Sequence, residues 1–399
     1  MRQRTDVMSL PHQGLDVVQW RRWGTAAVLL TVMLVCSSLV LTGCGSDVAP
    51  DAVHRPAWAK AASDSLLGSS RLDSESVIQR IDIQGPIGRQ SAQISGLAWW
   101  KDHLVMLPQY PSFATPDTAH LYIISRADLD AALRPSGGSM SIEPTPIPID
   151  TTGLQEIDGY QGLEAIAFAD DQAFLTIEAA GPAFGWIGMR AAIASARLHT
   201  NGASRVPFAL SVERTASLSV PSWIPNMAYE AVLVQQNQPV ALFEANGGNV
   251  APNATAMRFT STLDPSVSLS MSALEYRLTD ATAPDSLGRF WVTNYLYPGD
   301  VKRLNPAPDS VALAHGVGAS HQSQVAVERL VEFVVRDNRI VRTSTPPMWI
   351  ELTEAAGRNW EGIVRYRDGF LIATDMFPET MLAFVPGSSS KPARSNAAP

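Results

Sequence analysis

The sequence predicts an all-β fold, a single β-propeller that is closed by a strand from its N-terminal side. Runs of four to six apolar, β-branched and aromatic residues alternate with Gly, Pro, Asn and Asp, which is typical of strands and turns. One pattern of such runs returns five times, and no stretch between the runs has the 3.6-residue period of a long amphipathic helix. Sheets that repeat around an axis form a propeller.

Each repeat has a polar residue, an apolar run, a turn and a second apolar run that ends in another polar residue. A third run follows, and we expect a fourth strand, so that each repeat is one four-stranded blade. The two polar residues are 14 positions apart in four repeats and 19 apart in the remaining one, where Asp285–Arg289 enlarges the turn. The repeats begin at Ser95, Glu164, Glu230, Glu275 and Glu361.

This count predicts five blades. A sixth stays open, because 86 residues separate the starts of the last two repeats. The last repeat has only three strands, and we expect Ile78–Ile83 to supply its fourth by pairing with the strand around Met381–Phe384. This pairing would close the ring and remove an open sheet edge.

The polar residues of each hairpin should lie at the same end of the sheet, which predicts two rings around one mouth. The first ring contains Ser95, Glu164, Glu230, Glu275 and Glu361, and the second contains Gln109, Glu178, Glu244, Asn294 and Asp375. Seven carboxylates repel one another unless some are protonated or a cation lies among them. Ca²⁺ takes about 6–8 oxygen ligands, so we expect the two rings to converge on one Ca²⁺ site near the axis. The alternative, that these side chains are solvated or accept backbone N–H groups, stays open.

Composition excludes several other classes. The 399 residues include 30 Lys and Arg against 38 Asp and Glu, which argues against a protein that binds the nucleic-acid backbone. Cys36 and Cys44 are too few for a disulfide framework or a zinc site of the usual spacing. The sequence has no nucleophile elbow, zinc-protease motif or phosphate-binding loop. We expect a monomer.

The N-terminal segment has the organisation of a secretory signal. Arg21 and Arg22 precede an apolar run over Thr25–Leu41, and Leu41-Thr42-Gly43-Cys44 resembles the bacterial lipobox. We predict a signal peptide over residues 1–43, acylation of Cys44 with chains such as palmitate, a flexible tether to residue 74, the propeller over residues 75–386 and a disordered tail over 387–399. The chain would then be anchored in the cell envelope by lipid, at the outer membrane or cell surface. An uncleaved transmembrane anchor is the alternative.

The motifs at the starts of the repeats resemble a known family. They are Ser-Gly-Leu-Ala at 95, Gly-Leu-Glu-Ala at 162, Tyr-Glu-Ala at 229, Ala-Leu-Glu-Tyr at 273 and Asn-Trp-Glu-Gly-Ile at 359. They resemble the phytase-like propellers, described as having "esterase-like activity of phytase". The pattern is also similar to the five-bladed calcium-dependent nucleotidases, in which one Ser or Glu per blade lines a central calcium site. This resemblance implies that the calcium ligands are the first-ring residues Ser95, Glu164, Glu230, Glu275 and Glu361.

Two functions follow from these observations. The first is a calcium-dependent hydrolase of phosphoesters or esters, in which Ca²⁺ polarises the reacting oxygen and Glu178, Glu244 or Asp375 acts as general base. The second is a non-catalytic binding propeller with a structural ion, whose loops bind a protein partner.

Overall fold

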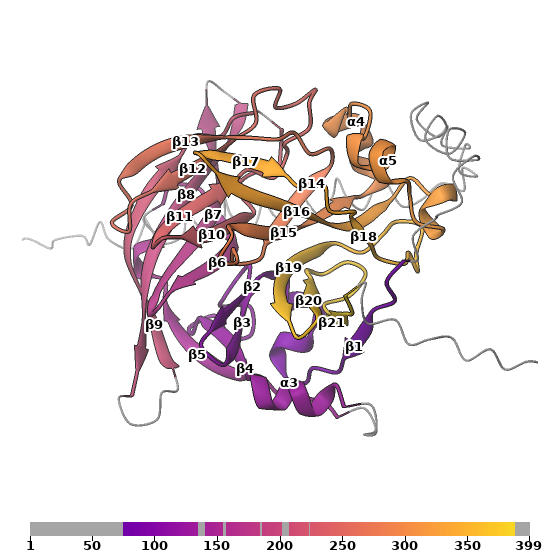
Figure 1. Ribbon diagram of the computed structural model, residues 1–399. Coiled ribbons are helices and arrows are strands. Elements are labelled where there is room, and N and C mark those ends of the chain that lie inside the picture. Colours follow the sequence, from indigo (N-terminus) through magenta and orange to yellow (C-terminus); the bar gives the residue numbers. More distant parts are fainter. Residues whose placement is uncertain are drawn as a thin grey trace, which may run out of the picture. The chain divides into compact units, whose positions relative to one another are not determined.

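Short antiparallel strands form most of the protein, as the computed structural model in Figure 1 shows. The structure describes residues 75–134, 140–154, 157–183, 186–201, 207–222 and 224–387. The predicted signal peptide, Cys44 and the tether lie outside these residues, and so does the predicted tail after residue 387. None of the helices in these ranges combines the length and the apolar composition that a membrane span requires.

The strands pair in antiparallel meanders of four, which we number 1 to 5. Meander 1 contains β2 (Ile94–Trp100), β3 (His103–Pro108), β4 (His120–Ser125) and β5 (Thr145–Asp150). Meander 2 contains β6 (Tyr160–Ala169), β7 (Gln172–Ala183), β8 (Trp186–Thr200) and β9 (Pro207–Leu218). Meander 3 contains β10 (Ala231–Gln235), β11 (Gln238–Leu242), β12 (Thr255–Phe259) and β13 (Pro265–Met271).

The last two meanders complete the set among the described strands. Meander 4 contains β14 (Arg277–Ala281), β15 (Arg289–Leu296), β16 (Val327–Arg336) and β17 (Arg339–Arg342), and β18 (Met348–Trp349) pairs with β16. Meander 5 contains β19 (Trp360–Tyr366), β20 (Gly369–Thr374), β21 (Leu382–Val385) and β1 (Gln79–Ile81).

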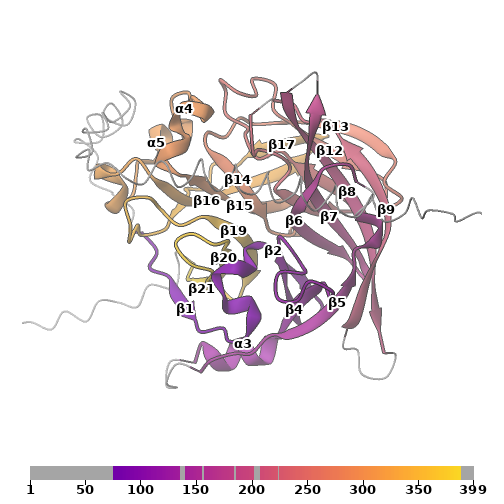
Figure 2. The ribbon, with the colours of Figure 1, turned by 180° about the vertical axis from the view of Figure 1, so that it is seen from behind.

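The N-terminal strand closes meander 5, which confirms the predicted closure. Strand β1 runs antiparallel to β21, with Gln79 opposite Phe384 and Ile81 opposite Leu382. Both views of the ribbon place β1 at this edge (Figures 1 and 2). Arg80 forms a two-pronged ion pair with Glu379, which fastens the same edge from outside.

The first strands of the meanders surround a central axis. Each of them contacts the first strand of the next meander, in the closed order β2, β6, β10, β14, β19 and back to β2. The all-β propeller prediction is therefore confirmed. The outermost strands also pair in parallel, β5 with β9 and β13 with β17, so that neighbouring meanders merge into larger sheets. The count of five blades stays a prediction for this reason.

Short helices occupy the connections. Helix α3 (Arg126–Ala132) follows β4, and the Ser125 hydroxyl caps it by accepting the Asp128 N–H at 3.1 Å. The long interval in which a sixth blade stayed open contains α4 (Val301–Leu304) and α5 (Ser310–His315), between β15 and β16. The side chain of Asp309 caps α5.

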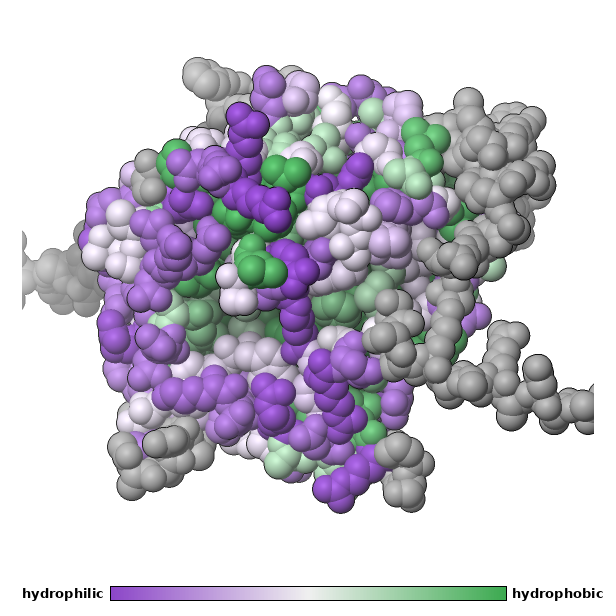
Figure 3. Space-filling view, viewed as in Figure 1, coloured by the Kyte–Doolittle hydropathy of each residue, from purple (hydrophilic) through white to green (hydrophobic). Residues whose placement is uncertain are grey.

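Apolar side chains pack between the sheets. Phe290 and Phe333 stack with their ring centroids 5.9 Å apart, and Trp100 and Trp360 are each only 1% exposed. On the face seen in Figure 3 the coloured residues are mostly hydrophilic, with hydrophobic residues in small separate groups. Burial of the apolar side chains away from water is the main favourable term for such a fold.

Glycine allows the first strands to approach closely at the axis. A Cβ atom at Gly362 would lie 2.6 Å from Cγ of Leu97, and a Cβ atom at Gly96 would lie 3.2 Å from Cα of Ala165. Both glycines directly follow a bulge in the first strand of their meander. These bulges decide which side chains reach the mouth of the ring.

Candidate functional site

The strand register identifies one equivalent position in each meander. In meanders 1, 4 and 5 one bulge interrupts the first strand and leaves one residue without a partner in the ladder, and in meander 2 the second of two bulges does the same. In meander 3 the same place falls directly before the first ladder pair, Ala231 with Leu242. These positions, which we name the inner ring, hold Ser95, Glu164, Glu230, Thr279 and Glu361.

Four of the five predicted first-ring residues therefore belong to the inner ring, and Glu275 does not. The Glu275 carboxylate accepts the Gly248 N–H at 2.8 Å and the Ala307 N–H at 2.9 Å, so it fastens two loops. Thr279 takes the fourth position instead. The enlarged turn and the bulge shift the register of meander 4, and alignment on a carboxylate could not detect this shift.

The hydroxyl groups of the inner ring join neighbouring meanders. The Ser95 hydroxyl donates to the Leu163 carbonyl at 2.6 Å, and the Thr279 hydroxyl donates to the Trp360 carbonyl. Each acceptor directly precedes the inner-ring glutamate of the next meander. Neither hydroxyl lines the central pocket, whereas Glu164, Glu230 and Glu361 do.

The predicted second ring divides in the same way. Gln109, Glu178 and Asp375 line the pocket, and Glu244 lies fully buried behind it. Asn294 is structural, because its amide donates to the carbonyls of Glu275 and Arg277 at 2.9 and 3.0 Å. In the strand register the position equivalent to Gln109, Glu178 and Asp375 is held by the next residue, Tyr295, which lines the pocket.

A cavity of about 670 Å³ opens at this mouth, and we name it the acidic pocket. Seven of its lining residues are acidic and two are basic. The acidic residues are Glu164, Glu178, Glu230, Asp300, Glu354, Glu361 and Asp375, and the basic ones are Arg277 and Arg303. Tyr110, Tyr295, Tyr297 and Phe377 add aromatic surface.

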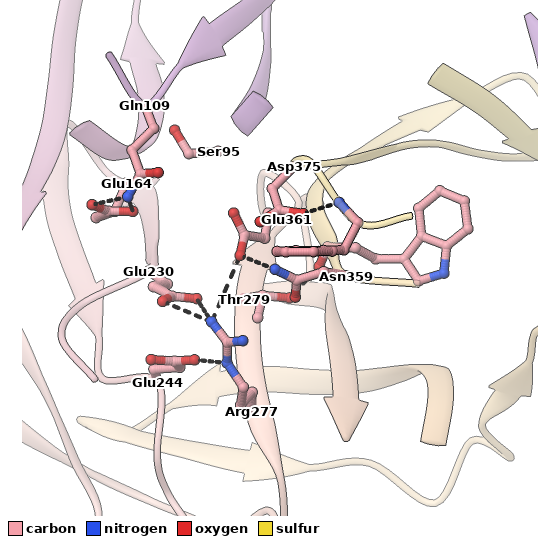
Figure 4. Close-up of polar contacts among 12 residues, drawn as sticks. Ser95, Gln109, Glu164, Glu230, Glu244, Arg277, Thr279, Asn359, Glu361 and Asp375 are labelled. Carbon is pink, nitrogen blue, oxygen red and sulfur yellow. Dashed lines mark hydrogen bonds and ion pairs between the residues drawn. The ribbon is translucent and has the colours of Figure 1, made fainter. Parts of the chain in front are cut away.

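Arg277 is the functional residue that the sequence did not reveal. Its guanidinium contacts Glu244 through Nε, and its Nη2 lies 3.2 Å from Glu230 Oε1 and 3.6 Å from Glu361 Oε1 (Figure 4). Burial opposes its charge, but the three carboxylates prevail and raise the pKa of Arg277 well above its usual value. The positive charge expected among the glutamates is thus supplied by the chain itself.

A positional signal for Arg277 does exist in the sequence. Arg277 lies two residues before inner-ring Thr279, and the same offset in meanders 1 and 5 gives Gln93 and Asn359, which also line the pocket. The signal appears only after the register places Thr279 in the ring. Because a basic residue occurs at this offset in one meander only, no repeat could reveal it.

Arg277 does not reach every carboxyl group. On the opposite side, among the described residues, Glu164 accepts the Gln109 amide alone, at 3.2 and 3.5 Å, and Glu178 Oε1 is buried without a hydrogen-bond partner. Both side chains belong to meander 2 and are 4% and 6% exposed. The acidic pocket therefore has a side that contacts Arg277 and a side that forms no ion pair with a described residue, which we name the unpaired side.

The unpaired side binds protons readily. Burial, followed by the charge of Glu178, raises the pKa of Glu164 to about 8, while the Gln109 amide opposes this change. Burial and then Glu244 raise the pKa of Glu178 to about 7. Because the two groups interact, they titrate as a pair near neutral pH.

Another pair of carboxyl groups, Glu361 and Asp375, lies in meander 5. Asp375 accepts the Phe377 N–H at 2.8 Å, and Glu361 accepts the Asn359 amide. Burial comes first among the causes that raise the pKa of both groups, and for Glu361 the charge of Asp375 is the next. Asp375 is thus held by backbone at the edge of the pocket.

The donor atoms of the pocket are oxygens, which suit a hard cation. Within the described ranges no group of three or more His, Cys, Asp or Glu side chains is placed to hold a metal ion. Arg277 occupies the position between Glu230, Glu244 and Glu361. The predicted convergence of Glu164, Glu230, Glu275 and Glu361 on one ion therefore stays a prediction, with Glu275 bound elsewhere.

Comparison with protein-family models gives no match, and neither does comparison with curated proteins, so the resemblance to phytase-like propellers stays a prediction. Solved structures give distant matches. One describes GH130 mannoside phosphorylases and glycoside hydrolases that target β-1,2 mannosidic linkages in Candida mannan, with 11% identity, a TM-score of 0.42, and coverage of 80% of this chain and 96% of that chain.

Two further structures are similar at the same level. A putative glycoside hydrolase from Parabacteroides distasonis has 12% identity and a TM-score of 0.40, covering 80% of this chain and 94% of its own. MPT-4, a mannose phosphorylase from Leishmania mexicana, has 12% identity and a TM-score of 0.39, covering 82% and 92%. At these values the chemistry of this chain has to be derived from its own residues.

Proposed function

We propose that the chain is a hydrolase whose reaction takes place in the acidic pocket. The observation that carries this proposal is the unpaired side of the pocket, where Glu178 keeps a buried oxygen without a partner beside Glu164. A buried carboxyl group without a partner costs stability, and such groups with raised pKa values in a cleft are candidates for catalysis.

The two meander 2 carboxyls suit acid–base catalysis at neutral pH. Glu164, with its pKa raised to about 8, is protonated at pH 7 and would donate that proton to the leaving-group oxygen. Glu178, with its pKa near 7, would accept a proton from the attacking water as the bond to the leaving group breaks. The pair thus returns to its starting protonation after one proton passes from Glu178 to Glu164 through solvent.

The charge of the pocket limits the substrate class. Seven acidic side chains against two arginines make the pocket unfavourable for a phosphate group, so we favour an uncharged scissile bond. Carboxylic esters and glycosides both have such bonds and both are hydrolysed by paired carboxyl groups.

Calcium binding is the second candidate, because the inner ring presents only oxygen donors in register. The unpaired oxygens Glu178 Oε1 and Glu244 Oε2 could also serve a cation. We assign no reaction step to a metal, since Arg277 already contacts three of the carboxylates. If Ca²⁺ binds the folded chain alone, an excess of about 100-fold over its Kd should add roughly 2.7 kcal/mol of stability, and a chelator should remove it.

The decisive experiment is hydrolysis by the full-length chain in detergent. Nitrophenyl carboxylic esters, glycosides and phosphates would be incubated with Ca²⁺ or with a chelator. Glu178→Gln should lower kcat/KM about 10²–10⁴-fold for the active class. Glu213→Gln, at an exposed ion pair with Arg197, is the matched control and should change nothing. Absence of turnover in all three classes would favour the non-catalytic binding propeller.

Attachment to a membrane remains a proposal based on the lipobox, since Cys44 lies outside the described residues. Cys44→Ser should abolish labelling with radioactive palmitate and leave the precursor uncleaved. Normal processing of that variant would contradict lipidation.

A further inference from the structure

The rim of the acidic pocket is built from exposed aromatic side chains. Tyr110, Tyr297 and Phe377 are 43%, 46% and 57% exposed, although large apolar side chains are usually covered. Each follows a strand of a different meander, Tyr110 after β3, Tyr297 after β15 and Phe377 after β20. All three line the same cavity.

The acidic side chains lie below this rim. Glu178 is only 6% exposed and its Oε1 has no partner, and Glu164 is bound by one amide alone. Burial, followed by the charges of Glu164 and Glu178, raises the pKa of Tyr110 to about 12. The Tyr110 side chain therefore stays a neutral phenol. Tyr110 therefore lies near the two carboxyl groups of the unpaired side, and Tyr297 and Phe377 line the same cavity.

We propose that the unpaired side of the acidic pocket binds an organic cation, an ammonium group whose charge faces Glu178 while its alkyl groups contact the aromatic rim. This inference rests on the proposed function and names its substrate class: an ester or glycoside that carries a positively charged group.

The aromatic rim is what distinguishes an organic cation from a metal ion. Ammonium groups are weakly hydrated when substituted and are attracted to aromatic faces, by about 0.5–2 kcal/mol per contact. Calcium instead requires about 6–8 oxygen ligands, to which aromatic rings contribute nothing. Arg277 is already shared by three carboxylates on the other side, so the charge of Glu178 is left to a ligand.

Calorimetric titration of the full-length chain in detergent at pH 7.5 tests the inference. Two cations are matched with neutral molecules of similar shape: choline with 3,3-dimethylbutan-1-ol, and benzylamine with benzyl alcohol. We expect at least one cation to bind tenfold or more tightly than its neutral counterpart. Equal affinities within both pairs would overturn the inference.

Variants then locate the binding site. Glu178→Gln should reduce the preference for the cation at least fivefold, and Phe377→Ala should weaken cation binding. Leu287→Ala, at a 66% exposed apolar side chain outside the pocket lining, is the control and should leave both affinities unchanged. A preference that survives Glu178→Gln would place the cation elsewhere and overturn the inference.

A titration in the presence of Ca²⁺ distinguishes a metal site from a site for organic cations. If 1 mM Ca²⁺ abolishes choline and benzylamine binding and binds more tightly than either, the pocket is a metal site and the inference is overturned. These probes cannot be hydrolysed, so their binding is independent of turnover. Hydrolysis without cation preference would leave the proposed function in place, and cation binding without hydrolysis would leave this inference in place.

Discussion

Two groups of buried charges in this molecule differ in how completely they are paired. The first, which we name the Glu328 network, consists of Glu328, Arg358 and Trp360. Glu328 is fully buried, and its carboxylate accepts the Arg358 N–H at 2.6 Å, the Arg358 guanidinium at 2.8 Å and the Trp360 indole N–H at 2.7 Å. The second is the acidic pocket, where Glu178 Oε1 has no partner.

The difference shows which charges serve the fold. In the Glu328 network one arginine serves one carboxylate and every carboxylate oxygen is bonded, so the group joins meanders 4 and 5 rigidly. In the acidic pocket one arginine is shared by Glu230, Glu244 and Glu361, two further carboxyls form no ion pair with a described residue, and burial raises the pKa of all five groups. A satisfied group of charges stabilises, while an incompletely paired one is ready for a ligand.

The largest expected effect comes from breaking the satisfied group. Arg358→Met should lower the free energy of unfolding by about 3–5 kcal/mol, because it leaves the Glu328 carboxylate buried without a cation. Urea unfolding at pH 7 measures the change. The double variant with Glu328→Gln should recover part of the lost stability. A loss below about 1 kcal/mol for Arg358→Met would contradict the claim that the Glu328 network stabilises the fold more than the charges of the pocket do.

Removal of the shared arginine should cost less, and the cost should depend on pH. Arg277→Met leaves Glu230 and Glu244 without the charge that lowers their pKa values, so both would bind protons more tightly. We expect a loss of about 2–4 kcal/mol at pH 8 and about 1 kcal/mol or less at pH 5, where protons replace the guanidinium. The same loss at both pH values would show that the three carboxylates do not take up protons.

The unpaired side predicts a stability that falls as pH rises. The pKa of Glu164 is raised from 4.5 to about 8, so the folded state holds a proton that the unfolded chain has released. The resulting stabilisation is complete below about pH 4.5 and is lost up to about pH 8. Glu164→Gln should make this slope shallower and gain about 2 kcal/mol at pH 8.5 in urea unfolding, while Glu178 keeps part of the slope. An unchanged slope would assign it to other groups.

The smallest effect is expected where charges meet in solvent. Lys101 and Asp171 form an ion pair of 3.1 Å with both side chains nearly half exposed. Lys101→Ala should change the free energy of unfolding by about 1 kcal/mol or less, and this change should vanish in 1 M salt. A larger loss would mean that the exposure of an ion pair does not indicate how much the pair stabilises this fold.

The sequence was sufficient for the parts of the fold that repeat. The 14-residue interval located the Glu164–Glu178 and Glu230–Glu244 hairpins, and the incomplete last repeat predicted that β1 would close it. Hydrophobic alternation and turn residues carry this information locally. A one-residue bulge leaves no trace in the hydrophobic alternation. Thr279 could therefore be placed in the inner ring only from the observed strand pairing.

The site was predicted less completely than the fold, for a related reason. The clustering of Glu164, Glu230 and Glu361 follows from repetition, but Arg277 occurs once and has no repeat to identify it. Glu275 lies outside the ring, and Arg277 adds a positive charge that the two predicted rings did not contain. Electrostatic balance in a buried site depends on single side chains, which spacing alone does not identify.

The pairing of β1 with β21 also governs when this molecule can finish folding. The two strands are separated by about 300 residues of chain, so their contact is among the most non-local in the protein and carries a large loop-closure entropy. Meanders 1 to 4 can pair their strands as synthesis proceeds, while β1 waits for β21. During that wait meander 5 lacks its outer strand and presents an open edge, so the step that completes the ring is also the one most exposed to aggregation.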